Sequence, residues 1–158
     1  MKPEEVIEEL KRSGTLSAST IEEVEENREL RHGLVHYFTQ HKDRDFALAF
    51  LKKLADIRRD PQGVMTGDSL MLACYILGKH GHVEDCMRIW ETKTIDFDTY
   101  CYVDIQLVVF AGVEKTIEYL KSLESEDAKE ALEYVMECLE GGDFENIEAY
   151  HNNVPWYI

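Results

Sequence analysis

Apolar residues recur along most of this chain at intervals of three and four positions, which is the spacing of one face of an α-helix. The clearest example follows the aspartates at 43 and 45, where the apolar positions are Phe46, Phe50, Leu51, Leu54 and Ile57. Alternation of apolar and polar residues, the pattern of a half-buried strand, is confined to a short ambiguous stretch over 100–109. The pattern therefore predicts an all-α protein of about eight or nine helices without a sheet.

Short polar residues, glycine and proline mark the expected helix ends in the first half of the chain. A short helix ends at Gly14, and a long helix is expected over about 19–41, with Ser19 or Thr20 as its N-cap. Either Asp43 or Asp45 opens the following helix, which stops before Pro61.

Similar signals divide the second half. Asp68 is the expected N-cap of one helix, and Asp96 is expected to break or cap the chain before a helix over 102–109. Ser125 is expected to cap a helix that ends at Gly141, with a last short helix after it.

The stretch "DSLMLACYILGKHGHVEDCMRIWETKTIDFDTY", residues 68–100, has small residues and a tyrosine in one helix, a glycine turn, and a second helix with an acidic start. It resembles a tetratricopeptide or pentatricopeptide unit. This resemblance implies an irregular α-solenoid of antiparallel helix pairs, because the flanking segments do not repeat the unit at a fixed period. A length of 158 residues fits a single helical-repeat domain over 1–158.

The formal net charge of −15 is concentrated near the C-terminus, where residues 99–158 carry 13 acidic and 3 basic residues. Such a field repels nucleic acid and anionic membranes, so neither is an expected partner, and it accelerates encounters with basic proteins. The N-terminus lacks the apolar run of a signal peptide, and the four cysteines form no CxxC pair, so we expect reduced thiols in a cytoplasmic protein. The sequence leaves the oligomeric state open.

Five glutamates spaced 4, 3, 4 and 3 residues apart fall on one side of the helix expected after Ser125, within about 80° of one another. Ala131, Leu132, Val135 and Leu139 are expected on the opposite, core-facing side. Because like charges at this spacing repel, the stripe is either a solvated face or a surface for a cationic partner. The residues that we expect to contact such a partner are Asp96, Asp98, Asp104, Glu114, Glu118, Glu126, Glu130, Glu133, Glu137 and Glu140.

Aromatic residues are numerous near these acids, at Phe97, Tyr100, Tyr102, Phe110 and Tyr119. Aromatic rings beside carboxylates are typical of an interaction surface for a partner rich in arginine or lysine. The pair Trp156-Tyr157 at the C-terminus is expected to close an open hydrophobic end of the helical array.

The sequence contains no glycine-rich phosphate loop and no serine or cysteine nucleophile signature. His32 and His36 share a helix face, and His80 and His82 precede Cys86, but both groups are better explained as ordinary core, interface or turn residues. We therefore expect no catalytic residue, no cofactor and no bound metal.

In size, acidity and lack of catalytic residues, the chain resembles bacterial immunity proteins of toxin–immunity pairs. The segment "DFDTYCYVDIQLVVFAGVEKTIEYLKS", residues 96–122, is similar to stretches of small bacterial proteins of this kind. The resemblance implies inhibition by occlusion, with acidic side chains covering the basic face of a toxin. A generic helical-repeat adaptor and an enzyme with a carboxylate-lined pocket are the alternatives.

Overall fold

The computed structural model describes residues 1–155 and 157–158, and all of the regular secondary structure in this part of the chain is helical. The described residues form eleven α-helices and one short 3-10 helix, with no strand. The prediction of an all-α protein is confirmed. The expected number of helices was too low, because two of the expected helices are each divided in two.

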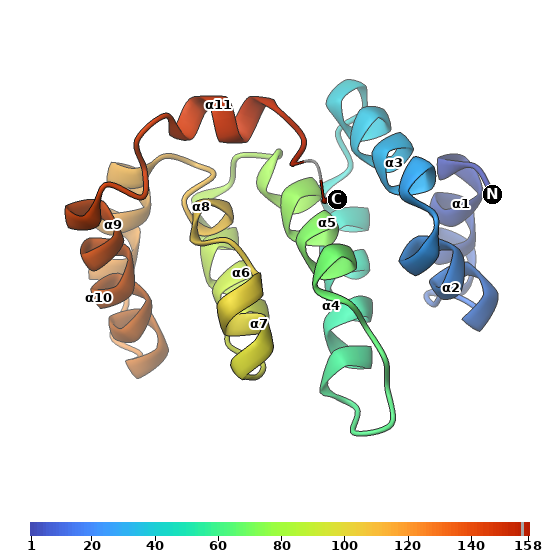
Figure 1. The fold of residues 1–158 in the computed structure, drawn as a ribbon, viewed down its shortest axis with the longest axis horizontal. Helices are drawn as coiled ribbons and strands as arrows, with labels where there is room; N and C mark the ends of the chain where they lie inside the picture. Colours follow the sequence, from blue (N-terminus) through green and yellow to red (C-terminus); the bar gives the residue numbers. More distant parts are fainter. Residues whose placement is uncertain (156) are drawn as a thin grey trace. The chain divides into compact units, whose positions relative to one another are not determined.

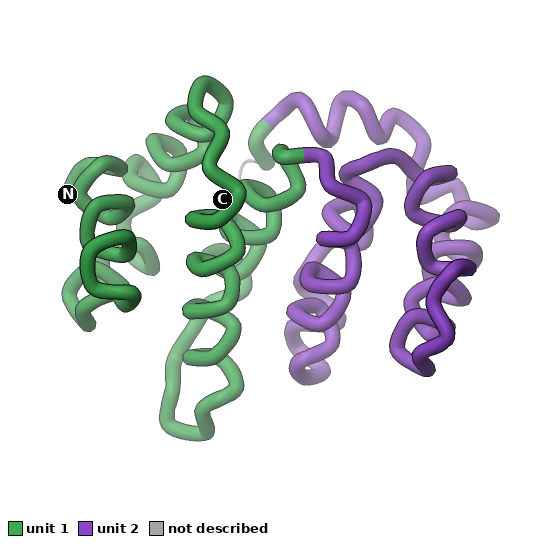
Figure 2. The backbone as a smooth tube through the Cα atoms, turned by 180° about the vertical axis from the view of Figure 1, so that it is seen from behind, with its two compact units in different colours: residues 1–80, 154–158 green, residues 81–153 purple. Residues whose placement is uncertain are grey.

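The chain forms two compact units, shown in separate colours in Figure 2. The first unit contains residues 1–80 together with 154–158, and the second contains residues 81–153. Each has its own buried apolar residues. The expectation of a single domain over 1–158 stays a prediction, since compactness of the parts does not decide whether they fold together.

The first unit is built around one almost fully buried helix (Figure 1). Its helices are α1 (Pro3–Ser13), α2 (Ala18–Glu26), α3 (Arg28–Gln40), α4 (Arg44–Arg59) and α5 (Gly67–Gly78). Residues 69–78 of α5 are all buried, and α2, α3 and α4 pack against it. An apolar residue on every side of a helix is expected only where neighbours surround it, and α5 is therefore the core of this unit.

The helix expected over 19–41 is two helices, and the break lies at Asn27. Asn27 has an extended backbone and caps α3, because its side-chain oxygen accepts a hydrogen bond from the amide of Leu30 (3.1 Å). The buried guanidinium of Arg31 donates to the carbonyl oxygens of Val24 (3.0 Å) and Glu25 (2.7 Å). Those carbonyls are at the end of α2 and would otherwise lack donors, so Arg31 stabilises the break.

The second unit begins with the 3-10 helix η1 (Val83–Asp85). Its α-helices are α6 (Cys86–Lys93), α7 (Phe97–Tyr102), α8 (Ile105–Val108), α9 (Val113–Ser122), α10 (Glu126–Gly141) and α11 (Ile147–Asn152). Helix α6 packs against α7, α8 and α10, while α9 packs against α10 and η1. Helix α6 is consequently in contact with most of the other elements of this unit.

Several expected helix ends are confirmed and others are wrong. Neither Ser19 nor Thr20 is the N-cap of α2, because Ser17 fills that role and its side chain accepts from the amide of Thr20. Asp43, Asp96 and Ser125 each accept the amide hydrogen bond expected of an N-cap. Asp68 is not a cap, because Thr66 fills that role and α5 starts at Gly67. The helix expected over 102–109 is divided between α7 and α8, because the backbone is extended at 103 and 104.

Candidate functional site

The predicted glutamate stripe lies on α10, and all five of its members are exposed. The opposite side is only partly as expected. Ala131 and Val135 are fully buried, whereas 43% of Leu139 is exposed, so its assignment to the core-facing side was wrong. Near the end of the helix Cys138 is buried in place of Leu139. The side of α10 that faces the core therefore includes Cys138 and the half-buried Tyr134. This rotation brings one edge of the stripe next to aromatic side chains.

A hollow of about 430 Å³ opens at that edge of α10. It combines three carboxylates with three aromatic rings, and its lining residues come from α6 with its C-cap, from α7 and from α10. They are Trp90, Thr94, Tyr100, Glu130, Glu133, Tyr134 and Glu137. We call this feature the aromatic–acidic hollow; its volume is within the range of small-ligand and side-chain pockets.

In the hollow the ring of Tyr134 contacts each of the other two aromatic rings at a tilted angle. The ring centroids of Tyr134 and Trp90 are 5.7 Å apart, and those of Tyr134 and Tyr100 are 5.3 Å apart. Trp90 is only 4% exposed, whereas Tyr100 is 37% exposed. The hollow thus has a buried indole at its base and a partly exposed phenol at its rim, with Tyr134 between them.

A buried lysine lies behind these rings. The ammonium of Lys93, at the end of α6, donates to the carbonyl oxygens of Tyr100 (2.5 Å) and Val103 (2.6 Å). It is also 5.0 Å from the ring centroid of Tyr100 and 5.5 Å from that of Tyr134. Burial lowers the pKa of Lys93, while the carboxylate of Asp104 opposes that shift. Lys93 thereby joins the end of α7 to α6 and orients the tyrosines.

Burial, with Cys138 and Tyr100 close by, raises the pKa of Tyr134 to about 12. The phenol therefore stays protonated at neutral pH and can donate a hydrogen bond to an oxygen in the hollow. A protonated phenol also adds no charge, so the negative charge of the hollow comes from its glutamates.

The structure brings three of the ten predicted partner-binding residues, Glu130, Glu133 and Glu137, into the hollow. Two of the other seven belong to α10: Glu126 pairs with Lys129 (2.6 Å), and Glu140 is exposed near the end of the helix. Glu114 and Glu118 are exposed on α9, which packs against α10.

The three predicted aspartates lie at the starts of α7 and α8. Asp96 caps α7, because its carboxylate accepts a hydrogen bond from the amide of Thr99 (2.9 Å), and its own amide donates to the hydroxyl of Thr99 (3.0 Å). Asp98 is exposed in the first turn of α7. Asp104 is half-buried and accepts a hydrogen bond from the hydroxyl of Tyr150 (2.7 Å), which ties α11 to the start of α8.

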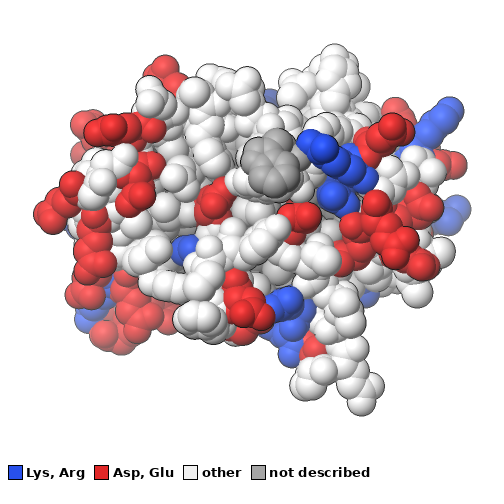
Figure 3. Space-filling model, in the orientation of Figure 1, with Lys and Arg blue, Asp and Glu red and all other residues white. Residues whose placement is uncertain are grey.

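The charge of the protein is divided unequally between its units. The second unit carries 18 acidic and 5 basic residues, a formal net charge of −13, whereas the first carries 14 and 12, a net charge of −2. In Figure 3 acidic side chains gather over α9 and α10 at the left of the view. The aromatic–acidic hollow therefore lies in the strongly negative unit.

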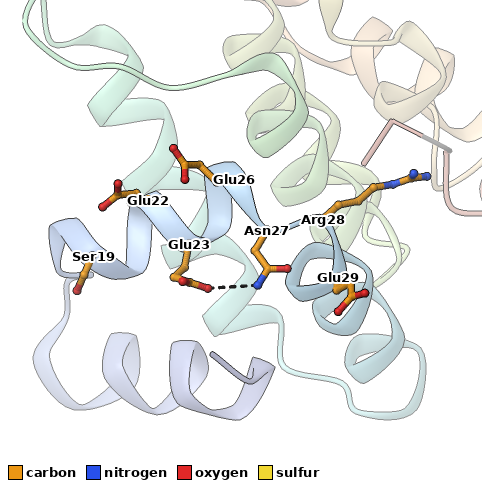
Figure 4. A pocket seen from close by; sticks show the side chains of 7 residues that line it. All are labelled: Ser19, Glu22, Glu23, Glu26, Asn27, Arg28 and Glu29. Atoms are coloured by element: carbon orange, nitrogen blue, oxygen red, sulfur yellow. Dashed lines mark hydrogen bonds between the residues drawn. The ribbon is translucent and has the colours of Figure 1, made fainter.

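The first unit has an acidic hollow of its own, which sequence reasoning missed (Figure 4). Its lining residues are Ser19, Glu22, Glu23, Glu26, Asn27, Arg28 and Glu29. Glu23 accepts a hydrogen bond from the side-chain amide of Asn27 (3.2 Å), and Arg28 extends away from Glu22 and Glu26. No aromatic residue lines this second hollow. The run of glutamates between 22 and 29 was the signal that could have revealed it.

The histidines considered as metal ligands have ordinary surroundings. His32 and His36 are exposed on α3. The ring of His80 interacts with the carbonyl of Ile76 (2.9 Å) and accepts from the amide of Asp43 (3.0 Å), so both nitrogens serve the packing of α4 and α5. Among residues 1–155 and 157–158, no three His, Cys, Asp or Glu side chains are grouped as metal ligands.

The remaining aromatic predictions have mixed outcomes. Phe97 and Tyr102 are exposed on α7, and Phe110 stacks on His151 with ring centroids 4.1 Å apart. Tyr119 is half-buried, as is Tyr157. Trp156 lies outside the described residues, so its expected capping role stays a prediction.

Three residues that line the hollow were missed as functional candidates, namely Trp90, Thr94 and Tyr134, and so was Lys93 behind the rings. Tyr134 follows Glu130 by four positions and precedes Glu137 by three, and this spacing places it beside the stripe. Lys93 gave no comparable signal, because a lysine at a helix end usually points into solvent.

No helix in the described part of the chain combines the length and the apolar content needed to cross a bilayer. Comparison of the chain with protein-family models, with curated proteins and with solved structures gives no match.

Proposed function

We propose that this protein is a non-enzymatic interaction module whose second unit binds a basic protein. The observation that carries the proposal is the aromatic–acidic hollow, where Glu130, Glu133 and Glu137 adjoin the rings of Tyr100 and Tyr134. Carboxylates alone would be equally compatible with a solvated face. Partly buried aromatic rings beside them supply the apolar contact area that a specific interface needs.

The charge of the second unit supports a basic partner. A net charge of −13 attracts positively charged proteins over distances comparable with the Debye length, about 8–10 Å at physiological salt. Attraction of this kind raises the association rate, while the buried contacts determine how slowly the complex dissociates.

Within this class we propose an immunity protein that neutralises a toxin by occlusion. An inhibitor that covers a basic substrate-binding face needs no catalytic group, and the hollow offers carboxylates and aromatic rings for contact. The same features would suit a generic adaptor. The effect of the partner on cell growth distinguishes an immunity protein, whose partner is toxic, from an adaptor.

We also propose that the helices within each unit follow an irregular solenoid pattern of antiparallel pairs. Contacts between helices that are close in sequence, such as α4 with α5 and α9 with α10, support this arrangement. The connections between these helices are short, as expected for paired helices.

The binding proposal is tested with charge reversal and a matched control. The test variant is Glu130→Lys, Glu133→Lys and Glu137→Lys; the control is Glu22→Lys, Glu26→Lys and Glu29→Lys, which makes the same charge change in the first unit. The basic protein captured from source cells by the full chain is purified, and its association rate is measured at low and moderate salt. We expect the test variant to associate about tenfold more slowly at low salt, and the control to be affected less.

The immunity proposal adds a growth assay. Expression of the captured partner alone is expected to stop growth, and co-expression of the wild-type chain is expected to restore it, whereas the test variant restores it poorly. Equal association rates for all three proteins, or rates independent of salt, would show that the stripe is only a solvated face. A partner harmless to growth would remove the immunity function and leave an adaptor.

A further inference from the structure

The aromatic–acidic hollow has a more specific chemistry than the acidic hollow of the first unit, which has no aromatic lining. Residues from three helices combine in the aromatic–acidic hollow. Helix α6 provides the buried indole of Trp90, α7 provides the partly exposed ring of Tyr100, and α10 provides the ring of Tyr134 with three carboxylates. This pairing of rings and carboxylates requires an occupant that is positively charged and also has a flat, weakly hydrated surface.

We propose that the aromatic–acidic hollow binds the guanidinium group of one arginine side chain of the basic partner. This inference rests on the proposed function and names the chemical group that is recognised. A guanidinium is planar and stacks on tyrosine or tryptophan, and its N–H groups match a carboxylate in two parallel hydrogen bonds. A lysine ammonium is more strongly hydrated and has no flat face, so it gains less from the rings.

Lys93 decides on which side of the rings the arginine binds. Its ammonium lies 5.0 Å from the ring centroid of Tyr100, and the residue is only 3% exposed. The buried side of the ring pair is therefore already occupied by a cation, which two carbonyl oxygens satisfy. The guanidinium of the partner therefore binds on the solvent-facing side of the rings, where Glu130, Glu133 and Glu137 are exposed.

The charges around the hollow favour a cation in spite of Lys93. Three carboxylates line it against one buried ammonium, and the basic side chain of Lys129 is paired with Glu126 instead. Glu130 and Glu137 are separated by about 10 Å along the axis of α10, with Glu133 between them. Carboxylates are thus available along the whole length of a bound side chain.

Helix α7 also carries exposed aromatic residues that do not line the hollow. Phe97 is 79% exposed and Tyr102 is 47% exposed, and both belong to α7, the helix that supplies Tyr100. Apolar contacts around a buried cation exclude water and strengthen the charge interaction. The acidic hollow of the first unit has carboxylates without rings, so it serves as an internal comparison.

The test uses the full chain and two blocked amino acids as probes. N-acetyl-arginine amide is titrated against the ¹⁵N-labelled protein, and N-acetyl-citrulline amide, its neutral isostere, is the control ligand. The readouts are the indole N–H signal of Trp90, assigned with Trp90→Phe, and the backbone amides of Tyr100 and Tyr134. We expect millimolar binding of the arginine probe at these signals, as is usual for so small a ligand, and no saturable binding of citrulline.

Variants separate the rings from the carboxylates. Glu130→Gln, Glu133→Gln and Glu137→Gln together should raise the Kd of the arginine probe by about tenfold. Tyr100→Leu, which keeps an apolar side chain at the rim, should raise it by about threefold. The matched control of Glu22→Gln, Glu26→Gln and Glu29→Gln should leave the Kd unchanged.

Three results in which a probe does bind would overturn the inference. They are shifts of equal size with citrulline, equal affinity for N-acetyl-lysine amide, and shifts confined to residues around Glu22 and Glu26. If the purified partner binds with the predicted salt dependence and the arginine probe does not bind, the proposed function stands and the arginine subsite is rejected. If the probe binds and charge reversal leaves partner association unchanged, the hollow binds a guanidinium, but the proposed docking face is rejected together with the partner's arginine as its occupant.

Discussion

Two buried cations have a similar structural role in this protein. Arg31 donates to carbonyls at the end of α2, and Lys93 donates to carbonyls at the end of α7. Helix ends leave such carbonyls without intrahelical partners, and a hydrogen bond from a charged donor stabilises them by roughly 1.5–3 kcal/mol. Both residues look like surface positions in the sequence, and only the contacts reveal why they are buried.

The thiol of Cys86 gives a pH prediction. Burial raises its pKa from 9.0 to about 12. Between these values the unfolded chain loses the thiol proton while the folded protein keeps it, so the free energy of unfolding falls as the pH rises. The unfolding equilibrium constant should increase by up to about tenfold per pH unit from this group alone.

The measurement is urea unfolding at several pH values between 8 and 10.5, for the wild type, Cys86→Ala and the exposed-cysteine control Cys101→Ala. Cys86→Ala should be less stable than the wild type at pH 8, because the smaller alanine buries less apolar surface. Its free energy of unfolding should nevertheless fall less steeply as the pH rises. Parallel curves for wild type and Cys86→Ala would contradict the prediction.

At the scale of elements, α10 is the best-defined helix of the second unit. Ser125 caps its start, and at its end the amide of Asp143 donates to the carbonyl of Cys138 (3.0 Å). The chain makes this turn with Gly142 in the left-handed region, at φ 83° and ψ 12°. A residue with a side chain is strained in that conformation, whereas glycine is not.

We therefore expect Gly142→Ala to destabilise the protein by about 1 kcal/mol. The neighbouring Gly141 is the last residue of α10 and has no positive φ. A Cβ there would meet only the flexible carboxylate of Asp143, at 3.3 Å. Gly141→Ala should consequently have the smaller effect. Denaturant unfolding of both variants tests this, and equal losses of stability would show that backbone conformation is not the reason.

At the scale of the whole molecule, the unequal charge of the two units has a consequence for stability. Self-repulsion within the second unit, with its net charge of −13, weakens its folded state, and salt screens that repulsion. We expect added sodium chloride, from about 20 to 200 mM, to slow amide hydrogen exchange in α10 more than in α4.

Helix α4 is a suitable reference because it carries charges of both signs, including the ion pairs of Asp56 with Lys52 and Arg59. Exchange is measured residue by residue on the full chain, so both units experience the same conditions. Equal slowing in the two helices would mean that charge repulsion does not limit the stability of the second unit.

The sequence by itself determined the helical class, a helix start at Asp43 or Asp45, a break or cap at Asp96, the cap at Ser125, and the exposure of the glutamate stripe. These features depend on residues three or four positions apart, so the order of residues is sufficient to predict them. Only the tertiary structure decided that the helix breaks at Asn27, that Thr66 and not Asp68 caps α5, and that Leu139 is exposed. The hollow likewise depends on α6, α7 and α10 meeting, with Lys93 and Tyr134 between them. Such contacts join residues distant in the chain, and local periodicity carries no information about which of them will meet.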